Sequence, residues 1–130
     1  MARIKKFKSP FSEEYNWQMA CEDGIIVNLT DYKDRHSFKV QSSIIFPVAI
    51  TREAWDKYIR PSEETRRINT INYILEAVSY HLGQDNVRGE LITRIDMKKM
   101  KIKTTKLYVN TIPGGFKYPN VIIIMLPEES

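Results

Sequence analysis

The most regular pattern of apolar and polar residues lies between Ser62 and Gly83. Apolar side chains recur there at alternating intervals of three and four residues, namely Ile68, Ile71, Leu75, Val78 and Leu82. This spacing is typical of a buried stripe along an amphipathic helix. Ser62, followed by two glutamates, favours the start of a helix, and Gly83 favours its end. The pattern predicts one long helix.

Period-two alternation, typical of strands, covers much of the remaining chain. Strands are expected over residues 25–29, 38–50, 90–95 and 100–112. Residues 121–126 are apolar at every position, which predicts a strand in the sheet centre, covered by a helix on at least one side. Gly114-Gly115 is expected to form the hairpin turn before it.

Two short helices complete the expected fold. One runs from Glu13 to Cys21 with Ser12 as its N-cap, and the other runs from Arg52 to Ile59 with Thr51 as its N-cap. Together the elements predict a single α+β domain: an antiparallel β-sheet with the long amphipathic helix packed on it. Residues 1–11 are expected to form a basic N-terminal arm, and residues 12–130 the domain.

Length and composition narrow the class of protein. A chain of 130 residues suits one compact domain, and its single cysteine, Cys21, excludes an internal disulfide framework and a multi-cysteine zinc site. The longest apolar run, residues 121–126, is far short of the roughly 20 residues of a membrane span. The start of the chain has no apolar run typical of a secretory signal, so a cytoplasmic location is expected.

Charge is segregated along the sequence although the formal net charge is only +4. Residues 1–10 contain four basic side chains and no acid, and residues 97–117 contain six lysines and no acid. Residues 11–96 hold 10 basic and 14 acidic side chains. Segregation of this kind favours an anionic partner or self-association.

The lysine-rich segment is the main candidate for binding an anion. On a strand, Lys99, Lys101 and Lys103 would share one face at intervals of about 6.6 Å, a spacing that can follow phosphates. The expected site adds two sets: Lys98 and Lys106 from the other face, and Lys5, Lys6 and Lys8 from the arm. The alternative is an edge strand whose lysines only prevent edge-to-edge aggregation.

The start of the long helix offers a second basic set. Arg66 and Arg67 lie near Arg60, and arginine forks at a helix N-terminus can bind a phosphate or a carboxylate. Glu63 and Glu64 are the alternative partners of these arginines. Farther along the helix, Tyr73 and Tyr80 share one flank and are expected to extend the core, with a dimer surface as the alternative.

Catalytic chemistry has little support in the sequence. His36 lies in a polar loop with Asp31 and Asp34, which leaves open a metal-dependent hydrolase or nuclease. His81, near the end of the long helix, is placed to interact favourably with the helix dipole, and Cys21 is expected to be a buried thiol. Nucleophile-elbow, Walker and dinucleotide-binding glycine patterns are absent from the sequence. No enzyme activity, metal or cofactor is therefore expected.

Four segments carry a family resemblance. They are Glu22 to Leu29, Phe46 to Trp55, Pro113-Gly114-Gly115 and Val121 to Glu129. In this order and spacing they resemble domain-of-unknown-function family 6573, small proteins of bacterial plasmids, integrated elements and phages. Phe116 and Lys117 stand where acidic residues are expected, and the lysine-rich strand departs from the family pattern. The resemblance implies a mobile-element setting and supplies no activity or site residues.

These observations predict a small non-enzymatic binding protein of phage or mobile-element origin. Its expected partner is anionic: nucleic acid, a nucleotide signal, or a host protein that handles nucleic acid, with counter-defence as a role that fits the setting. Besides the hydrolase, the alternative is a structural homodimer without a ligand, in which the lysine strand of one copy contacts an acidic surface of the other. No membrane association is expected.

Overall fold

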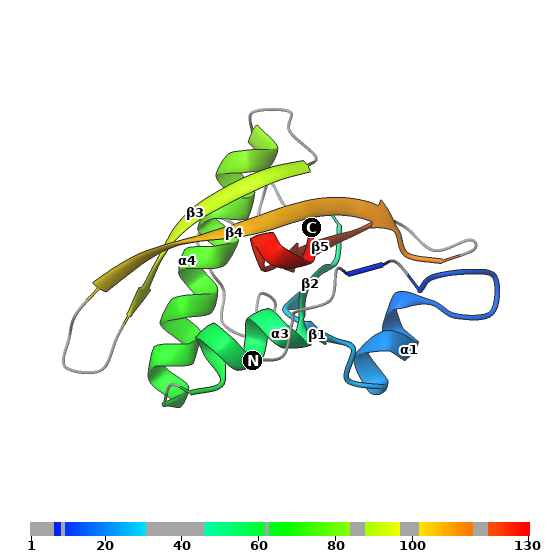
Figure 1. Ribbon diagram of the computed structural model, residues 1–130, viewed down its shortest axis with the longest axis horizontal. Helices are drawn as coiled ribbons and strands as arrows, with labels where there is room; N and C mark the ends of the chain where they lie inside the picture. Colours follow the sequence, from blue (N-terminus) through cyan, green and yellow to red (C-terminus); the bar gives the residue numbers. More distant parts are fainter. Residues whose placement is uncertain are drawn as a thin grey trace.

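A five-stranded mixed sheet forms the centre of the protein, as seen in a computed structural model (Figure 1). The structure describes residues 7–8, 10–30, 46–61, 63–83, 88–96, 102–115 and 120–130. The strand order is β1-β2-β5-β4-β3. The strand bounds are Ile26–Asn28 for β1, Val48–Thr51 for β2, Arg88–Asp96 for β3, Ile102–Pro113 for β4 and Asn120–Met125 for β5.

The sheet is mixed, so the expectation of a wholly antiparallel sheet was wrong. Strands β2 and β5 run parallel, with Ala49 opposite Ile123, whereas the other three strand pairs are antiparallel. No tight turn joins β2 to β5, because helices and two further strands lie between them in the chain. Their relative direction is therefore set by this long crossover, which leaves no local sequence signal.

The central place of β5 is confirmed, and its two faces support two apolar clusters. Ile122 and Ile124 belong to the cluster on one side of the sheet, together with Ile71, Leu75 and Val78 of the long helix. Val121, Ile123 and Met125 belong to the cluster on the other side, together with Trp17 and Ala20. A strand buried on both faces needs apolar residues at every position, and residues 121–125 provide them.

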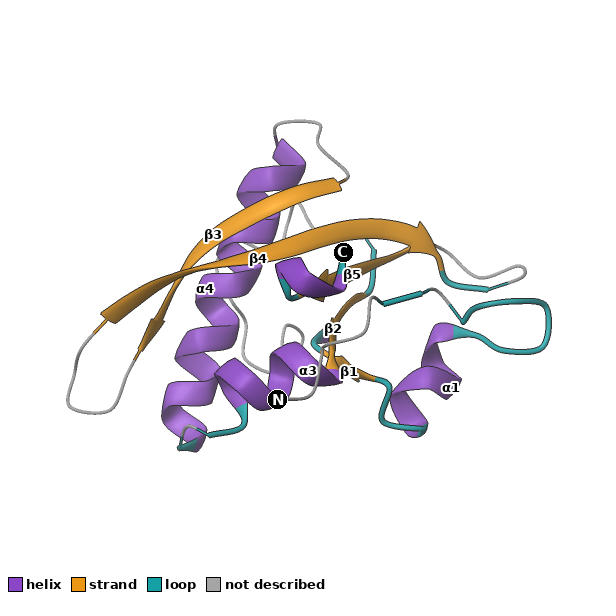
Figure 2. Cartoon of the chain, viewed as in Figure 1, coloured by secondary structure: helices purple, strands orange, loops and turns teal. Residues whose placement is uncertain are grey.

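The long helix α4 extends over Glu64–Gly83 and covers one side of the sheet (Figure 2). Its expected stripe is buried at Ile71, Leu75 and Val78 and half-buried at Ile68. Tyr80 departs from the prediction, because its side chain is 73% exposed and does not extend the core.

The first helix, α1, extends over Trp17–Glu22, several residues later than expected. Its N-cap is Asn16, whose Oδ1 accepts a hydrogen bond from the backbone N–H of Met19 at 3.0 Å, and not Ser12. Tertiary contacts fix this start: Trp17 is buried against the sheet, and its backbone N–H donates to the Gly114 carbonyl at 3.0 Å. Gly115 has φ +121° and closely approaches the backbone of Asn16.

The second short helix is confirmed over Arg52 to Ile59, with an unexpected change of geometry inside it. Thr51 caps helix α3 (Arg52–Ala54) by accepting from the Ala54 N–H, and the chain continues as π-helix η2 (Trp55–Ile59). Trp55 and Ile59, at the two ends of this π-helix, are both buried in the apolar cluster that the sheet forms with α4.

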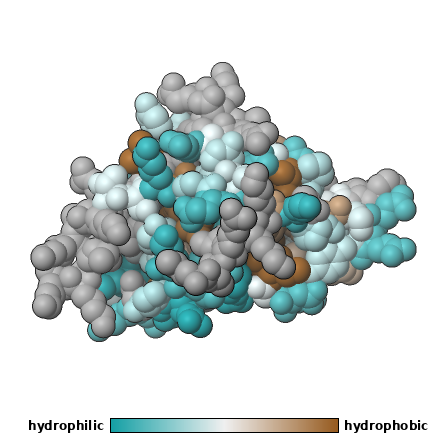
Figure 3. Space-filling view, viewed as in Figure 1, coloured by the Kyte–Doolittle hydropathy of each residue, from teal (hydrophilic) through white to brown (hydrophobic). Residues whose placement is uncertain are grey.

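A 3₁₀ helix, η4 (Pro127–Glu129), follows β5 on the side of the sheet opposite α4. The described helices include none that is long and apolar enough to cross a membrane. On the face shown in Figure 3, polar and weakly polar residues predominate, and the apolar ones form separate patches.

Candidate anion-binding surface

Lys106 is the member of the lysine-rich segment whose side chain the structure describes. It lies on β4 opposite Ile92 of β3, and its side chain is 63% exposed. Lys103 is also in β4, opposite Ile95, but its side chain lies outside the described part of the structure, as do Lys98, Lys99 and Lys101. The structure thus places only Lys106 of this segment, which was predicted to lie on the strand face opposite Lys99, Lys101 and Lys103. The positions of the other lysine side chains stay a prediction.

The neighbours of Lys106 show which face of the sheet it occupies. Leu107 and Val109 are buried in the cluster formed with α4, whereas Tyr108 packs against the cluster on the opposite side. Because side chains alternate along a strand, Lys106 shares the face of Tyr108. Lys106 therefore points away from α4.

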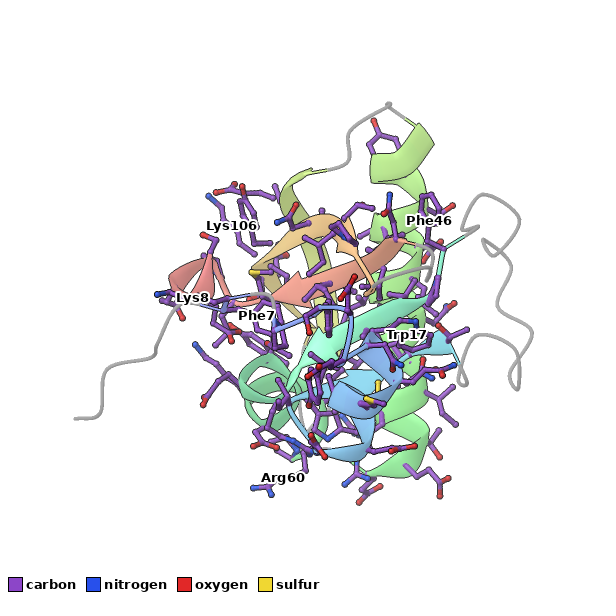
Figure 4. The ribbon with its side chains drawn as sticks, turned by 90° about the vertical axis from the view of Figure 1, so that its right-hand side faces the viewer. Phe7, Lys8, Trp17, Phe46, Arg60 and Lys106 are labelled. Atoms are coloured by element: carbon purple, nitrogen blue, oxygen red, sulfur yellow. The ribbon has the colours of Figure 1, made fainter. Side chains whose placement is uncertain are left out.

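The N-terminal segment lies on this same face. The backbone N–H of Phe7 donates to the carbonyl of Glu129 in η4 at 2.7 Å, and Phe7 and Phe11 pack against the cluster that also contacts Tyr108. Lys8, next to Phe7, is exposed. Figure 4 shows Lys8 and Lys106 on the side of the molecule where η4 lies. Lys5 and Lys6 lie outside the described residues.

One carboxylate accompanies Lys106. The Lys106 Nζ lies 4.0 Å from Glu90 Oε2, and both side chains are more than half exposed. An exposed pair of this kind contributes about 0–1 kcal/mol and is weakened by salt. Glu90 can therefore be replaced by a stronger anionic partner at small cost.

The arginines at the start of α4 lie elsewhere and are bound to the protein itself. Arg67 Nη2 donates to the carbonyl of Arg60 at 2.7 Å, which ties the end of η2 to the first turn of α4. Arg66 and Arg67 are both half-buried. Figure 4 places Arg60 far from Lys8 and Lys106, at another end of the molecule. The structure therefore does not bring the two predicted basic sets together.

An acidic residue, Asp56, is the ionic partner of Arg60 and of Arg52. Asp56 Oδ1 lies 3.5 Å from Arg60 Nε and 4.0 Å from Arg52 Nη1. The Nε of Arg52 also donates to the Gly24 carbonyl at 3.0 Å. Arg52 and Arg67 each donate one guanidinium N–H within the fold, and Asp56 is already an ionic partner of Arg52 and Arg60, so the lysine face is the better candidate for an external anion.

Sequence reasoning missed the buried carboxyl group of Glu129. Its Oε1 accepts hydrogen bonds from Thr51 Oγ1 at 2.6 Å and from the Leu126 backbone N–H at 3.0 Å, and the residue is 4% exposed. Burial raises the pKa of this carboxyl, the two hydrogen bonds oppose the rise, and the nearby carboxylates of Glu53 and Glu128 add to it. The only sequence signal was the position of two glutamates close after an apolar strand, behind Pro127.

A second ionisable pair lies beside α1. The Tyr15 hydroxyl donates to Asp23 Oδ2 at 2.6 Å, and this hydrogen bond, with smaller contributions from burial and the aspartate charge, raises the pKa of Tyr15 to about 12. This hydrogen bond connects Tyr15, in the segment before α1, with Asp23, in the turn after α1. Its exposed position and local span indicate a structural role.

The residues considered for catalysis are mostly outside the described structure. His36, Asp31 and Asp34 fall there, and so does the side chain of His81. Cys21 is half-buried in α1 and packs beside the second apolar cluster. Within the described ranges, no group of three or more histidine, cysteine or acidic side chains is placed to hold a metal ion.

Comparison of the chain with protein-family models, with curated proteins and with solved structures found no match. The resemblance to domain-of-unknown-function family 6573 accordingly remains a proposal that rests on the four sequence segments.

Proposed function

We propose that the protein is a non-enzymatic binding protein that takes an anionic partner on the face of the sheet opposite α4. The observation that carries this proposal is the position of Lys8 and Lys106. They come from the two acid-free basic segments of the sequence, far apart in the chain, and both lie exposed on the side where η4 packs. A shared basic face built from distant segments is what contact with a polyanion requires.

Nucleic acid is the partner that this chemistry fits best. A lysine ammonium is a compact point charge, which contacts phosphate oxygens without reading base edges. Binding to the backbone without sequence preference is therefore expected. A nucleotide signal or a host protein that handles nucleic acid would use the same charges, and a mobile-element protein could serve counter-defence through any of the three.

The proposal is tested by fluorescence anisotropy with labelled duplex DNA, single-stranded DNA and RNA between about 50 and 200 mM salt. Five lysine–phosphate contacts to duplex DNA give a slope near −4.5 in a plot of log K against log salt. The double variant Lys8→Gln/Lys106→Gln removes two contacts and should reduce the magnitude of the slope by about 1.8.

Lys57→Gln is the matched control, because Lys57 is exposed on η2, lies 5.2 Å from the Tyr58 ring and belongs to neither basic segment. It should leave the slope unchanged. Absence of binding to all three probes at the lowest salt would overturn the nucleic-acid proposal. Lys57→Gln removes one charge and the double variant removes two. An effect of Lys57→Gln half as large as that of the double variant would therefore show that net charge, and not this face, is responsible.

A further inference from the structure

Strand β3 lies at one end of the sheet, and along one edge it pairs with β4. It is nine residues long, from Arg88 to Asp96. No other described strand pairs with its outer edge. An edge of this length presents a row of backbone donors and acceptors that can accept another strand.

The residues of β3 follow a symmetric order of charge. Alternate positions share one face of a strand, and here they are Arg88, Glu90, Ile92, Arg94 and Asp96. The order is symmetric about Ile92 with the charges reversed. Two residues from Ile92, Glu90 on one side corresponds to Arg94 on the other, and four residues from it, Arg88 corresponds to Asp96. The central Ile92 is 64% exposed, one of the few large apolar side chains at the surface of the described structure.

We propose that β3 pairs antiparallel with β3 of a second copy of this chain, about a two-fold axis at Ile92. In that register Arg88 lies opposite the partner's Asp96, Glu90 lies opposite the partner's Arg94, and the two Ile92 residues face each other. Every charged position on this face meets an opposite charge, and each such pair occurs twice by symmetry. Opposite charges at directly facing strand positions stabilise the pairing, and like charges oppose it.

The pattern selects this register over its neighbours. A shift of two residues in one direction sets Arg88 against the partner's Arg94, and a shift in the other sets Glu90 against the partner's Asp96. Both shifts also place Ile92 opposite a charge. A self-complementary order of this kind is a property of pairing with an identical strand, so a second copy is the occupant to which the charges point.

The resulting assembly is a continuous sheet formed from two five-stranded sheets. Because the axis is perpendicular to the sheet, both α4 helices, which pack on β3, lie on the same side. A single strand pair is small beside the roughly 1,200–2,000 Å² of standard interfaces, so the dimer is expected to dissociate on dilution. The inference does not rest on the anion-binding proposal, although Glu90, which it uses, also forms the ion pair with Lys106.

Sedimentation velocity of the full chain over a concentration series tests the proposal. The unaltered protein should change from monomer to dimer as its concentration rises. Glu90→Arg places arginine opposite Arg94, and Arg94→Glu places glutamate opposite Glu90, so each variant alone should dissociate at least about tenfold more readily.

Mixing the two single variants supplies the decisive result. In the mixed pair, the Glu90→Arg chain has a basic residue at positions 90 and 94, and the Arg94→Glu chain has an acidic residue at both. Every 90–94 contact then joins opposite charges, so the mixture should form a heterodimer although neither variant pairs with itself. The combined variant Glu90→Arg/Arg94→Glu should likewise recover the dimer. Recovery in either arm also shows that the substituted chains are folded, although Glu90→Arg places a cation beside Lys106.

Glu22→Arg is the matched control, since it makes the same charge change at an exposed position at the end of α1. It should dimerise as the unaltered protein does. A chain that stays monomeric at all concentrations would overturn the proposal, and so would a dimer that both single variants retain. Failure of the mixture and of the combined variant to pair would overturn the register centred on Ile92.

Discussion

Glu129 ties three parts of the chain together through one carboxyl oxygen and its backbone carbonyl. Its Oε1 accepts from the hydroxyl of Thr51 at the end of β2 and from the N–H of Leu126 at the start of η4, and its own carbonyl accepts from Phe7. These contacts hold η4 and the N-terminal segment against the sheet. A buried oxygen with two donors is costly to remove, because both donors are then left without a partner.

The variant Glu129→Ala should lower the free energy of unfolding by about 1–3 kcal/mol, the cost of an unsatisfied buried group. Glu129→Gln keeps an acceptor oxygen and should cost less. Urea denaturation of both variants beside the unaltered protein measures the difference. Equal losses in the two variants would contradict a role for the acceptor.

The same pair of variants tests the raised pKa. A carboxyl whose pKa is higher in the folded than in the unfolded state contributes stability below its unfolded pKa, and this contribution is lost as the pH rises through the folded pKa. Glu129→Gln cannot ionise, so its stability relative to the unaltered protein should improve as the pH rises from about 4 to 8. A constant difference across that range would show that burial does not raise this pKa.

Gly115 illustrates a close contact that depends on the absence of a side chain. A Cβ at this position would lie 3.1 Å from both Cα and Cβ of Asn16, on a backbone with φ +121°. Gly115→Ala should therefore destabilise the fold by about 1–3 kcal/mol, as judged by thermal unfolding. Gly83→Ala is the control, since Gly83 is the last residue of helix α4, and it should be neutral or slightly stabilising.

At the scale of elements, the beginning of α1 shows how tertiary contacts override a local signal. Ser12 followed by Glu13 and Glu14 is a sound helix start by propensity, yet the helix begins at Trp17. The buried indole of Trp17 and the hydrogen bond from the Trp17 backbone N–H to the Gly114 carbonyl fix the chain there. Thr51, by contrast, caps its helix as predicted, because its local signal and the packing of Trp55 agree.

This difference gives a direct comparison of two caps. Asn16→Ala removes the acceptor for the Met19 N–H and should cost about 1 kcal/mol, whereas Ser12→Ala should have little effect. Chemical denaturation of the two alanine variants is the measurement. A larger loss from Ser12→Ala would show that the helix begins where the sequence alone predicted.

At the scale of the whole molecule, the pattern of apolar residues predicted the central strand and the covering helix better than it predicted how distant elements pair. The apolar run of β5 and the stripe of α4 identified the central strand and the covering helix, because burial on two faces or on one leaves a clear pattern. The parallel pairing of β2 with β5 depends on how distant elements meet, and so does the separation of Arg60, to which Arg67 is hydrogen-bonded, from Lys106. No local pattern records either one.

The position of β5 has a consequence for how the protein is made. Strands β1 and β2 form one part of the sheet and β3 and β4 another, and β5, which follows all four in the chain, is the strand that joins them. During synthesis, the edges of β2 and β4 that pair with β5 stay unpaired until residues 120–125 leave the ribosome. A chain synthesised only as far as β4 leaves the edges of β2 and β4 that pair with β5 open, and open strand edges favour aggregation.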